Sequence, residues 1–588
     1  MTIDDTAQGK TKASVRLDQI QQQVLGKSNP RRQKKTKAAE GPADWSDVLA
    51  ELDQVRKLAQ TPKTNTTGYI RHKEAGKLWV RERVEMLLDA GSFREVGSAA
   101  GTATWVKANP SSDNIVEAEK EIIADFVPSN NVQGFGNIRG RRVLLTADDF
   151  TLRAGHADGA LMAKTLYMEK LAVHMKLPMI KLVDGSSGGG SITTYRVQKA
   201  SYIPQLELLP WVMRQLDLGI PNCAAVVGPA VGLGAARAAG CHFSVMANDI
   251  GSLFNAGPKV VEGATFEEDL SPKELGGADI HCCNGVIDNL AADERGCYDQ
   301  IAQFLQYVPN HGGVLPPVLP STDEPNRLCP ELREAIPRRR QRSYDVRSII
   351  HHLVDRDSFF EIGRLWGRTV VVGLARLGGR PVGIFADDPQ FNAGAMDTPG
   401  CQKLMKHIKL CDVMGLPLIQ LLDIPGQNIR FAIGTAAERS ACMKWAMELC
   451  KAYFSTTIPI YTIIIRRCYG IGGAILADNR NPNCRVAWPS VNWGSLPLDG
   501  GIEGMKFHIP LTLRRAGENY KQVYGRLEAE YLNLMNPVRT ANYFGIEEII
   551  DPAMTRTLAC EWTKDMYETN LPERLKQRDC GKIQPSFA

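Results

Sequence analysis

Short apolar runs recur along the chain, and most of them end in an acidic residue or in glycines. Six examples are VLLTAD (143–148), MIKLVD (179–184), CAAVVG (223–228), VGIFAD (382–387), LIQLLD (418–423) and YTIIIR (461–466). Runs without polar alternation are typical of strands buried on both faces of a parallel sheet. Stretches of helical length lie between them, at 157–175, 193–216, 397–414 and 434–454. The pattern therefore predicts an α/β fold built from β-α-β crossovers.

The predicted elements occur twice in the same order. GRRVLLTADDF (140–150) resembles GRPVGIFADDP (379–389), and LPMIKLVDG (177–185) resembles LPLIQLLDI (416–424), both at a shift of 239 residues. IPNCAAVVGPAVGLGAA (220–236) matches IPIYTIIIRRCYGIGGA (458–474) at a shift of 238, and LLDAGSFREVG (87–97) matches LVDRDSFFEIG (353–363) at 266. Ordered repeats of this kind predict an internal duplication. We divide the chain into a flexible basic tail at 1–44, an N-terminal domain at 45–320 and a C-terminal domain at 321–588.

Composition narrows the function classes. The 588 residues are 44% hydrophobic and 23% charged, with a net charge of +5, which gives no argument for nucleic-acid binding. No apolar window reaches the length of a membrane span. RRQKK in the tail is either a targeting address or part of a solvated tail, and we expect the latter. The 14 cysteines show neither CxxC pairs nor zinc spacing. We therefore expect reduced thiols, no metal and a cytoplasmic protein, with the mitochondrial matrix as the alternative.

A glycine cluster follows the third predicted strand of each repeat. GPAVGLGAARAAG (228–240) has its counterpart in YGIGGAIL (469–476), which places Gly232 and Gly234 over Gly470 and Gly472. Glycine permits a strained turn, and the first amides of a following helix point outward without partners. Such amides hold a phosphate or a transient oxyanion, but neither cluster has the lysine of a phosphate loop. Close helix–strand packing is the alternative. Two clusters in register favour two oxyanion holes that act on two substrates.

Several longer motifs carry a resemblance to a known family. They are GKLWVRERVEMLLDAGSFREVG (76–97), LFNAGPKVVEGATFEEDLSPKELGGADIH (253–281), SYDVRSIIHHLVDRDSFFEIG (343–363), ARLGGRPVGIFADDP (375–389) and RVAWPS (485–490). From about 70 to 575, the chain resembles the carboxyltransferase (β) subunits of biotin-dependent acyl-CoA carboxylases. The resemblance implies two homologous crotonase-like domains, each a ββα spiral.

The resemblance also implies a mechanism and site residues. Carboxybiotin on a separate carrier protein would release CO2 beside an acyl-CoA, whose thioester enolate attacks it. The amides of Leu233 and Gly234, with Gly232 shaping the turn, would hold the enolate. Those of Ile471 and Gly472, with Gly470, would hold the biotin oxygen. Further substrate-binding positions are expected at Ala154, Gly155, Gly188, Gly189, Ala393, Gly394, Gly473 and Ala474.

The implied partners are an acyl-CoA and a biotin carboxylase with its biotin carrier, because the chain shows no AMKM biotinylation site and no ATP-grasp loop. A homo-hexameric core is expected, with each site between the first domain of one subunit and the second domain of another. Three segments depart from the common family pattern: DGSSGGGSITTY (184–195), YGIGGAI (469–475) and WGSLPLDGGIEG (493–504). They leave the acyl group open, and we expect Gly473 and Ala474 to line a pocket for branched or longer acyl chains.

Two alternative functions remain at this stage. The same site could serve an acyl-CoA decarboxylase, or a crotonase-like hydrolase with His156 as the base. For His156 and His242 we expect structural or binding roles rather than general-base roles. Asp184 and Asp423 end equivalent strands, and we expect them to cap the following turns rather than form a catalytic pair. Asp148, Asp149, Asp387 and Asp388 also end strands, without metal-ligand spacing.

Overall fold

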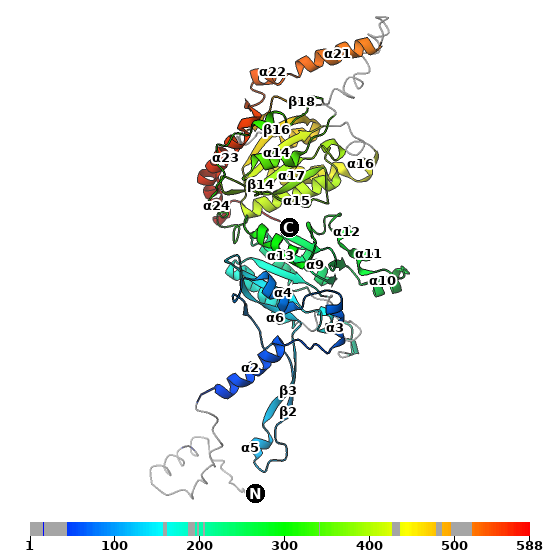
Figure 1. Ribbon diagram of the computed structural model, residues 1–588, viewed down its shortest axis with the longest axis vertical. Coiled ribbons are helices and arrows are strands. Elements are labelled where there is room, and N and C mark those ends of the chain that lie inside the picture. The colour runs from blue at the N-terminus through cyan, green and yellow to red at the C-terminus, as the bar shows by residue number, and fades with distance from the viewer. Residues whose placement is uncertain are drawn as a thin grey trace, which may run out of the picture. The chain divides into compact units, whose positions relative to one another are not determined.

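The computed structural model describes residue 16 and residues 44–156, 161–185, 195–196, 199–203, 206–339, 342–425, 435–477, 485–495 and 520–587. The chain divides into two compact units. The first consists of residues 1–61 and 102–127, and the second of residues 62–101 and 128–588. Both large sheets belong to the second unit (Figure 1).

The first sheet has seven strands, in the order β1-β4-β5-β6-β7-β9-β11. The pairs β1/β4 and β4/β5 are antiparallel, and the remaining pairs are parallel. The strands β6, β7 and β9 are buried along their whole length, as expected for parallel strands covered on both faces. The bounds are β1 Arg94–Glu95, β4 Asn131–Ile138, β5 Arg141–Asp148, β6 Met179–Val183, β7 Asn222–Val226, β9 Phe243–Ala247 and β11 Asn289–Ala291.

The second sheet repeats this pattern of directions. Its order is β12-β13-β14-β15-β16-β17-β19, with β18 also paired to β16. The first two pairs are antiparallel and the others parallel. The bounds are β12 Phe360–Ile362, β13 Val370–Leu377, β14 Arg380–Asp387, β15 Leu418–Ile424, β16 Ile460–Tyr469, β17 Arg485–Ala487, β18 Asn492–Gly494 and β19 Glu548–Ile549.

The register of the two sheets follows the shifts found in the sequence. Leu144 pairs with Met179 in the first sheet, and Gly383 pairs with Leu418 in the second, 239 residues later in both cases. Arg94 pairs with Phe135, and the residues 266 and 239 positions later, Phe360 and Leu374, also pair. A single-residue slip would move every side chain to the opposite face, so equal register places equivalent side chains on equivalent faces.

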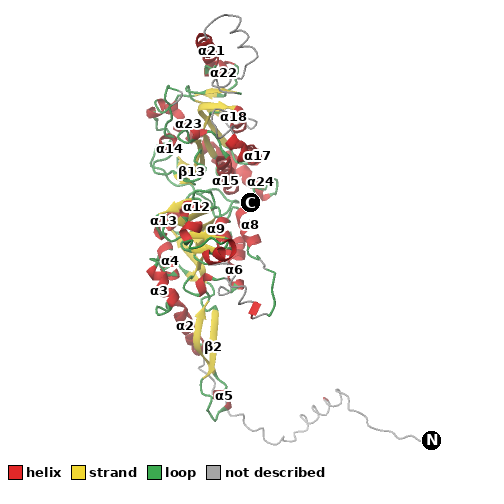
Figure 2. Ribbon diagram, turned by 90° about the vertical axis from the view of Figure 1, so that its right-hand side faces the viewer, coloured by secondary structure: helices red, strands yellow, loops and turns green. Residues whose placement is uncertain are grey.

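Helices connect and cover the strands (Figure 2). In the first half they are α3 Thr67–Glu74, α4 Val80–Leu87, η1 Arg153–Gly155, α6 Met162–Met175, α8 Leu209–Asp217, α9 Leu233–Ala239, α10 Pro258–Thr265, α11 Pro272–Gly276, α12 Ala278–His281 and α13 Glu294–Leu305. Two short strands, β8 Pro229–Val231 and β10 Ser252–Phe254, pair in parallel beside α9.

The helices of the second half follow the same plan and add a C-terminal set. They are η3 Pro330–Arg333, α14 Val346–Leu353, η4 Asn392–Gly394, α15 Thr398–Met414, α16 Thr435–Arg439, α17 Cys442–Ser455, α18 Gly470–Leu476, α21 Tyr520–Leu534, α22 Pro537–Asn542, η5 Pro552–Met554, α23 Thr555–Asp565, η6 Met566–Asn570 and α24 Leu571–Asp579.

Two of the predicted helices differ in the structure. The helix expected over 193–216 is wrong for residues 199–203, which are irregular, and α8 begins only at Leu209. Ile203 precedes a proline in the sequence, and a residue before proline disfavours the helical conformation. The helix expected over 434–454 breaks at Ala441, whose φ of 55° is left-handed, so α16 and α17 are separate helices.

The core of the second unit includes residues from both sheets. Phe243 of the first sheet stacks on Phe304 and meets Phe360 of the second sheet edge-on, with ring centroids 5.0 and 5.4 Å apart. The Asn289 side chain donates to the Glu361 carbonyl and accepts from the Gly363 amide. Burial of these aromatic rings joins the two halves through apolar surface rather than through a linker alone.

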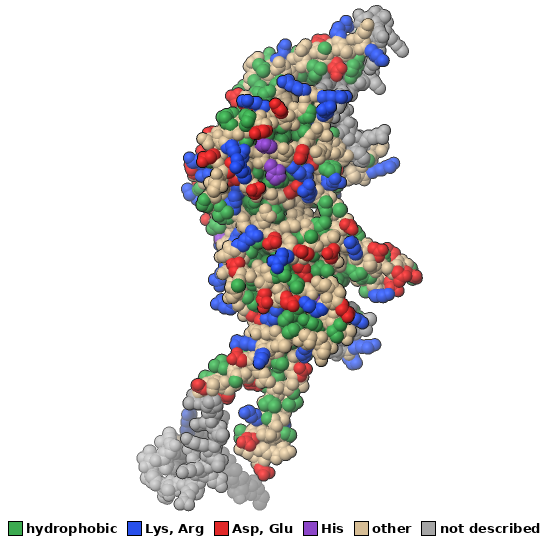
Figure 3. Space-filling model, in the orientation of Figure 1, with side chains coloured by type: hydrophobic (Ala, Val, Ile, Leu, Met, Phe, Trp, Pro, Cys, Tyr) green, Lys and Arg blue, Asp and Glu red, His purple; other side chains and the backbone are tan. Residues whose placement is uncertain are grey.

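The first unit was not anticipated from the sequence. It contains α2 (Ser46–Gln60), α5 (Ile115–Ala118) and a two-stranded sheet of β2 (Gly101–Lys107) and β3 (Glu121–Pro128). Among the described residues, no helix combines the length and the apolar character needed to cross a membrane. Acidic and basic side chains are interspersed on the face shown in Figure 3, in keeping with the nearly balanced net charge.

Candidate active site

The first glycine cluster forms a tight turn between β8 and α9. Gly232 caps α9 with φ 55° and ψ −112°, a conformation open mainly to glycine. Its amide donates to the Phe254 carbonyl at 2.8 Å. The next two amides, of Leu233 and Gly234, lie in the first helical turn, where an N–H has no acceptor within the helix. No acceptor for either amide lies within hydrogen-bond distance among the described residues.

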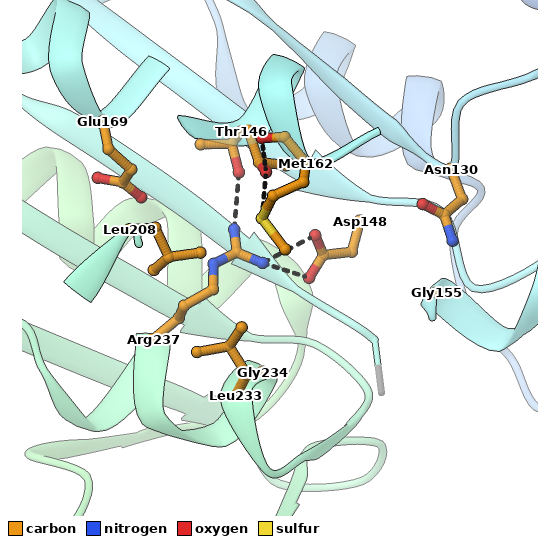
Figure 4. A pocket seen from close by; sticks show the side chains of 11 residues that line it. Asn130, Thr146, Asp148, Gly155, Met162, Glu169, Leu208, Leu233, Gly234 and Arg237 are labelled. Carbon is orange, nitrogen blue, oxygen red and sulfur yellow. Dashed lines mark hydrogen bonds and ion pairs between the residues drawn. The ribbon is translucent and has the colours of Figure 1, made fainter. Parts of the chain in front are cut away.

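Three chain segments converge at the carboxyl ends of β5, β6 and β7. A Cβ on Gly155 would lie 2.6 Å from the Gly185 Cα, and a Cβ on Gly234 would lie 2.6 Å from the Gly185 carbonyl oxygen. These glycines therefore allow backbone-to-backbone contact that no larger residue permits. A pocket opens here (Figure 4), lined by Asn130, Thr146, Asp148, Gly155, Met162, Thr165, Glu169, Leu208, Leu233, Gly234 and Arg237.

The loop before α6 is strained, and its counterpart before α15 is strained in the same way. Arg153 and Ala154 have φ values of 53° and 51°, and Asn392 and Ala393 have values of 48° and 52°. Such conformations are uncommon for residues other than glycine and are held in place by the surrounding structure. The amides of Gly155 and Gly394 donate to nearby carbonyls of their own loops. These loops therefore shape the site and do not offer those two amides to a ligand.

The second glycine cluster begins where β16 ends. Gly470, with φ 64°, is the first residue of α18, and the amides of Ile471 and Gly472 follow in the first turn. Ile471 is 70% exposed. Gly473 faces β16, where a Cβ would lie 2.9 Å from the Cys468 sulfur, whereas Ala474 is exposed. The expected positions Gly188 and Gly189 lie outside the described residues.

Asp184 and Asp423 are buried in ion pairs, and because most of the residues that follow them lie outside the described residues, the expectation that they cap those turns stays a prediction. The pairs are Arg83–Asp184 (2.7 Å), Lys77–Asp184 (3.3 Å), Arg466–Asp423 (2.8 Å) and Arg467–Asp423 (2.6 Å). Burial opposes ionisation of Asp423, but the two arginines hold its pKa below the usual value. The cations come from the segment leading into α4 and α4 itself in the first half, and from β16 itself in the second. Sequence reasoning missed them because they are not equivalent in the repeats.

Arg237 is a pocket residue that sequence reasoning did not single out. Its guanidinium donates to Asp148 at 3.2 Å and to the Thr146 hydroxyl at 2.8 Å (Figure 4). A helical side chain leans toward the N-terminus of its helix, which carries Arg237 back over the turn that holds Leu233 and Gly234. The available signal was an isolated charge in the otherwise small-residue run GLGAARAAG.

The two candidate histidines differ in their surroundings. His242 is buried, its Nδ1 accepts from the Asn222 amide at 3.2 Å and its Nε2 donates to the Leu216 carbonyl at 3.1 Å. Burial lowers the pKa of His242 to about 3, so it is a neutral structural residue. The carbonyl of His156 accepts from Asn130 at 2.7 Å, and its ring Nδ1 has no partner within hydrogen-bond distance in the described part of the chain.

Comparison with known proteins decides the family. Residues 71–578 match the carboxyl transferase domain. The chain belongs to the carboxyl transferase family. The propionyl-CoA carboxylase beta chain of Sus scrofa is 30% identical over 500 residues, which cover 83% of this chain and 85% of that protein. The acetyl-/propionyl-coenzyme A carboxylase beta5 subunit of Mycobacterium tuberculosis is 30% identical over 523 residues, 86% of this chain and 90% of that one.

Two solved structures share the fold. The transcarboxylase 12S hexamer core, determined with methylmalonyl-coenzyme A, superposes with a TM-score of 0.75 at 24% identity and covers 90% of this chain and 97% of that one. A single-chain long-chain acyl-CoA carboxylase gives a TM-score of 0.70 over 89% of this chain and 49% of that one. The expected resemblance to acyl-CoA carboxylase carboxyltransferases and the expected α/β fold are thus confirmed.

Proposed function

We propose that this chain is the carboxyltransferase subunit of a biotin-dependent acyl-CoA carboxylase and moves a carboxyl group from carboxybiotin on a separate carrier to the α or vinylogous carbon of an acyl-CoA. One observation carries the proposal. Two sheets with the same strand directions and register are each followed by a glycine cluster whose first helix amides have no acceptor within hydrogen-bond distance among the described residues. Two oxyanions, one on each substrate, require two such sites.

The roles follow from which amides remain available. Leu233 and Gly234 stabilise the thioester enolate oxygen, and Gly232 sets the turn that aims their amides. Ile471 and Gly472 face the biotin ureido oxygen, with Gly470 in the equivalent turn position. Carboxybiotin supplies the CO2 when its carrier is bound. The Ala154–Gly155 and Ala393–Gly394 loops place backbone close to each cluster, because their strained conformations let glycine pack on the neighbouring strand ends.

The two halves descend, in this proposal, from an internal duplication. Support comes from the matching strand directions and from ladder pairs that recur at the sequence shifts of 239 and 266. The proposed domains, 45–320 and 321–588 after a tail at 1–44, each contain one large sheet. A homo-hexameric core is proposed because the structurally similar transcarboxylase 12S is described as a hexamer. Mitochondrial relatives leave the matrix as an alternative to a cytoplasmic location.

The acyl group is proposed to be branched or longer than acetyl. Gly473 has no side chain beside Cys468, and Ala474 carries only a methyl group at an exposed position. Gly188 and Gly189 are proposed to contact the substrate as well. Relative rates with acetyl-, propionyl-, methylcrotonyl- and octanoyl-CoA test this part. Faster carboxylation of acetyl-CoA than of the others would contradict it.

The decisive experiment supplies the purified protein with a biotinylated carrier domain and malonyl- or methylmalonyl-CoA and measures CO2 release and carrier carboxylation. We expect CO2 loss from the thioester only when biotin is present, with the thioester intact. Biotin-independent CO2 loss would instead indicate a decarboxylase, and release of free CoA would indicate a hydrolase. The same protein without carrier, and the carrier without protein, are the controls.

A further inference from the structure

Asp148 and Asp387 occupy the same place in the two sheets. Each is the last residue of its strand, β5 or β14, and they pair across the antiparallel ladder with Asn131 and Val370, 239 residues apart in both cases. Each side chain accepts a hydrogen bond from the backbone amide of an acid near the end of the neighbouring strand: Asp148 from Asp184 at 3.4 Å and Asp387 from Asp423 at 2.9 Å. Asp148 lines the first pocket. Equal register places Asp387 at the matching edge of the second sheet, where it interacts with Cys468, the residue against which Gly473 of the second cluster packs.

The first of these acids is compensated by a cation. Both oxygens of Asp148 lie within 3.4 Å of an Arg237 nitrogen, and one also accepts from the Asn131 side chain at 3.2 Å. The ion pair is largely buried, with side-chain exposures of 12% for Arg237 and 8% for Asp148. Arg237 stands three residues after Gly234 in the same helix. The positive charge of Arg237 therefore comes from α9, the same helix that carries the proposed enolate-binding amides.

The second acid has no such partner. Ile475 stands at the shift of 238 residues from Arg237, and no cation of the described residues lies within ion-pair distance of Asp387. Its side chain is fully buried, and its Oδ1 has no hydrogen-bond partner in the described part of the chain. A buried carboxylate with one amide hydrogen bond and no counterion costs far more free energy than the neutral acid at the same place.

The charged groups around Asp387 do not change this conclusion. Arg467 of β16 forms an ion pair with Asp423 at 2.6 Å. The neighbouring Asp388 forms an ion pair with Arg347 at 2.6 Å. Cys468, also on β16, is a thiol whose pKa burial raises to about 12, so it contributes no charge. Burial, only partly offset by the Asp423 amide, raises the pKa of Asp387 well above its ordinary value.

We propose that the two glycine clusters are shielded from their strand-end acids by different means: Arg237 neutralises Asp148 in the first cluster, and Asp387 remains a neutral carboxylic acid in the second. Arg237 and Asp387 are thus positioning residues. An uncompensated carboxylate at either place would oppose the negative charge that the neighbouring amides stabilise. The link to an oxyanion rests on the proposed function, whereas the protonation of Asp387 does not.

The first test concerns Arg237 and uses kinetics of carboxyl transfer. In Arg237→Met the Asp148 carboxylate loses its counterion but keeps hydrogen bonds to both oxygens, from the Asn131 side chain and the Asp184 amide, which the Oδ1 of Asp387 lacks. Its negative charge then opposes the enolate, so we expect kcat to fall about ten-fold or more while KM changes by less than about two-fold. In the double variant Arg237→Met with Asp148→Asn, most of the lost kcat returns. A double variant as slow as the single one would overturn this role and indicate that Arg237 contacts the substrate itself. Circular dichroism and thermal melting of both variants separate misfolding from the charge effect.

The second test concerns Asp387 and needs no activity. Infrared difference spectra of wild type minus Asp387→Asn at pH 7 are expected to show the carbonyl band of a protonated carboxylic acid. Wild type minus Asp148→Asn is the matched control and is expected to show carboxylate bands instead. Carboxylate bands in the Asp387 difference spectrum would overturn the proposal for the second cluster. Because the spectra are recorded without substrate, this outcome is independent of whether the chain transfers carboxyl groups.

Discussion

Replacing Gly234 with alanine tests the geometry of the first cluster most directly. A Cβ there would lie 2.6 Å from the Gly185 carbonyl oxygen, whereas ordinary van der Waals contact begins at 3.4 Å. The first turn of α9 must therefore move by roughly 0.8 Å, the difference between these distances. Misplacement by about 1 Å costs on the order of 10²-fold in rate, and loss of one oxyanion donor costs about 10²- to 10³-fold. We expect kcat to fall about 100-fold.

The chain offers a matched comparison at the equivalent position. A Cβ on Gly472 would lie 3.3 Å from a side-chain methyl of Ile424, which can yield by rotating. Gly472→Ala is therefore expected to cost less than about ten-fold. Gly257→Ala serves as the folding control, because no atom lies within 4 Å of its Cβ position and its φ of −68° suits any residue.

The assay is steady-state, biotin-dependent decarboxylation of methylmalonyl-CoA, with thioester affinity measured by calorimetry. Ground-state affinity is expected to change little, because the amides act mainly on charge that develops during reaction. A Gly234→Ala enzyme with wild-type kcat would falsify the assignment of these amides. Equal losses in Gly234→Ala and Gly472→Ala would show that the distances to neighbouring atoms do not govern the effect.

Three further predictions concern buried ionisable groups. Burial lowers the pKa of Lys403 to about 7, so the unfolded state binds more protons above pH 7 and stability rises with pH. Relative to Lys403→Met, wild type should gain about 2 kcal/mol in urea unfolding between pH 7 and pH 9, and a flat difference would refute this. Arg83→Met leaves Asp184 with Lys77 as its remaining cation and removes the cation that pairs with buried Glu294, so it should cost about 3–5 kcal/mol. Loss of the exposed Arg333–Asp551 pair in Arg333→Met should change stability far less, and similar melting shifts for both variants would contradict this. Since His242 stays neutral above about pH 3, His242→Gln should leave the shape of the kcat/KM profile between pH 5 and pH 8 unchanged; loss of an inflection there would assign His242 to the chemistry.

The strands and the glycine clusters were predictable because their signals are local. The short apolar runs before Asp184 and Asp423 favour buried strands, and the same pattern at the equivalent place in both halves strengthens that prediction. The helix over 193–216 was not predictable at the same level. Its apolar residues suit a helix. The chain nevertheless bends at 199–200 and is irregular at 201–203, ahead of a proline, so no continuous helix forms there.

The sequence by itself determined the order in which the predicted strands follow one another along the chain, the two places where a glycine cluster follows a strand, and the family. Only the tertiary structure decided which side chains meet at the strand ends. Arg83 reaches Asp184 across 101 residues, and Arg237 reaches Asp148 across 89. Periodicity fixes which face of an element is buried, whereas an ion pair between distant elements depends on how those faces pack. The different partners of Asp148 and Asp387, which occupy equivalent positions in the two repeats, therefore became visible only in the fold.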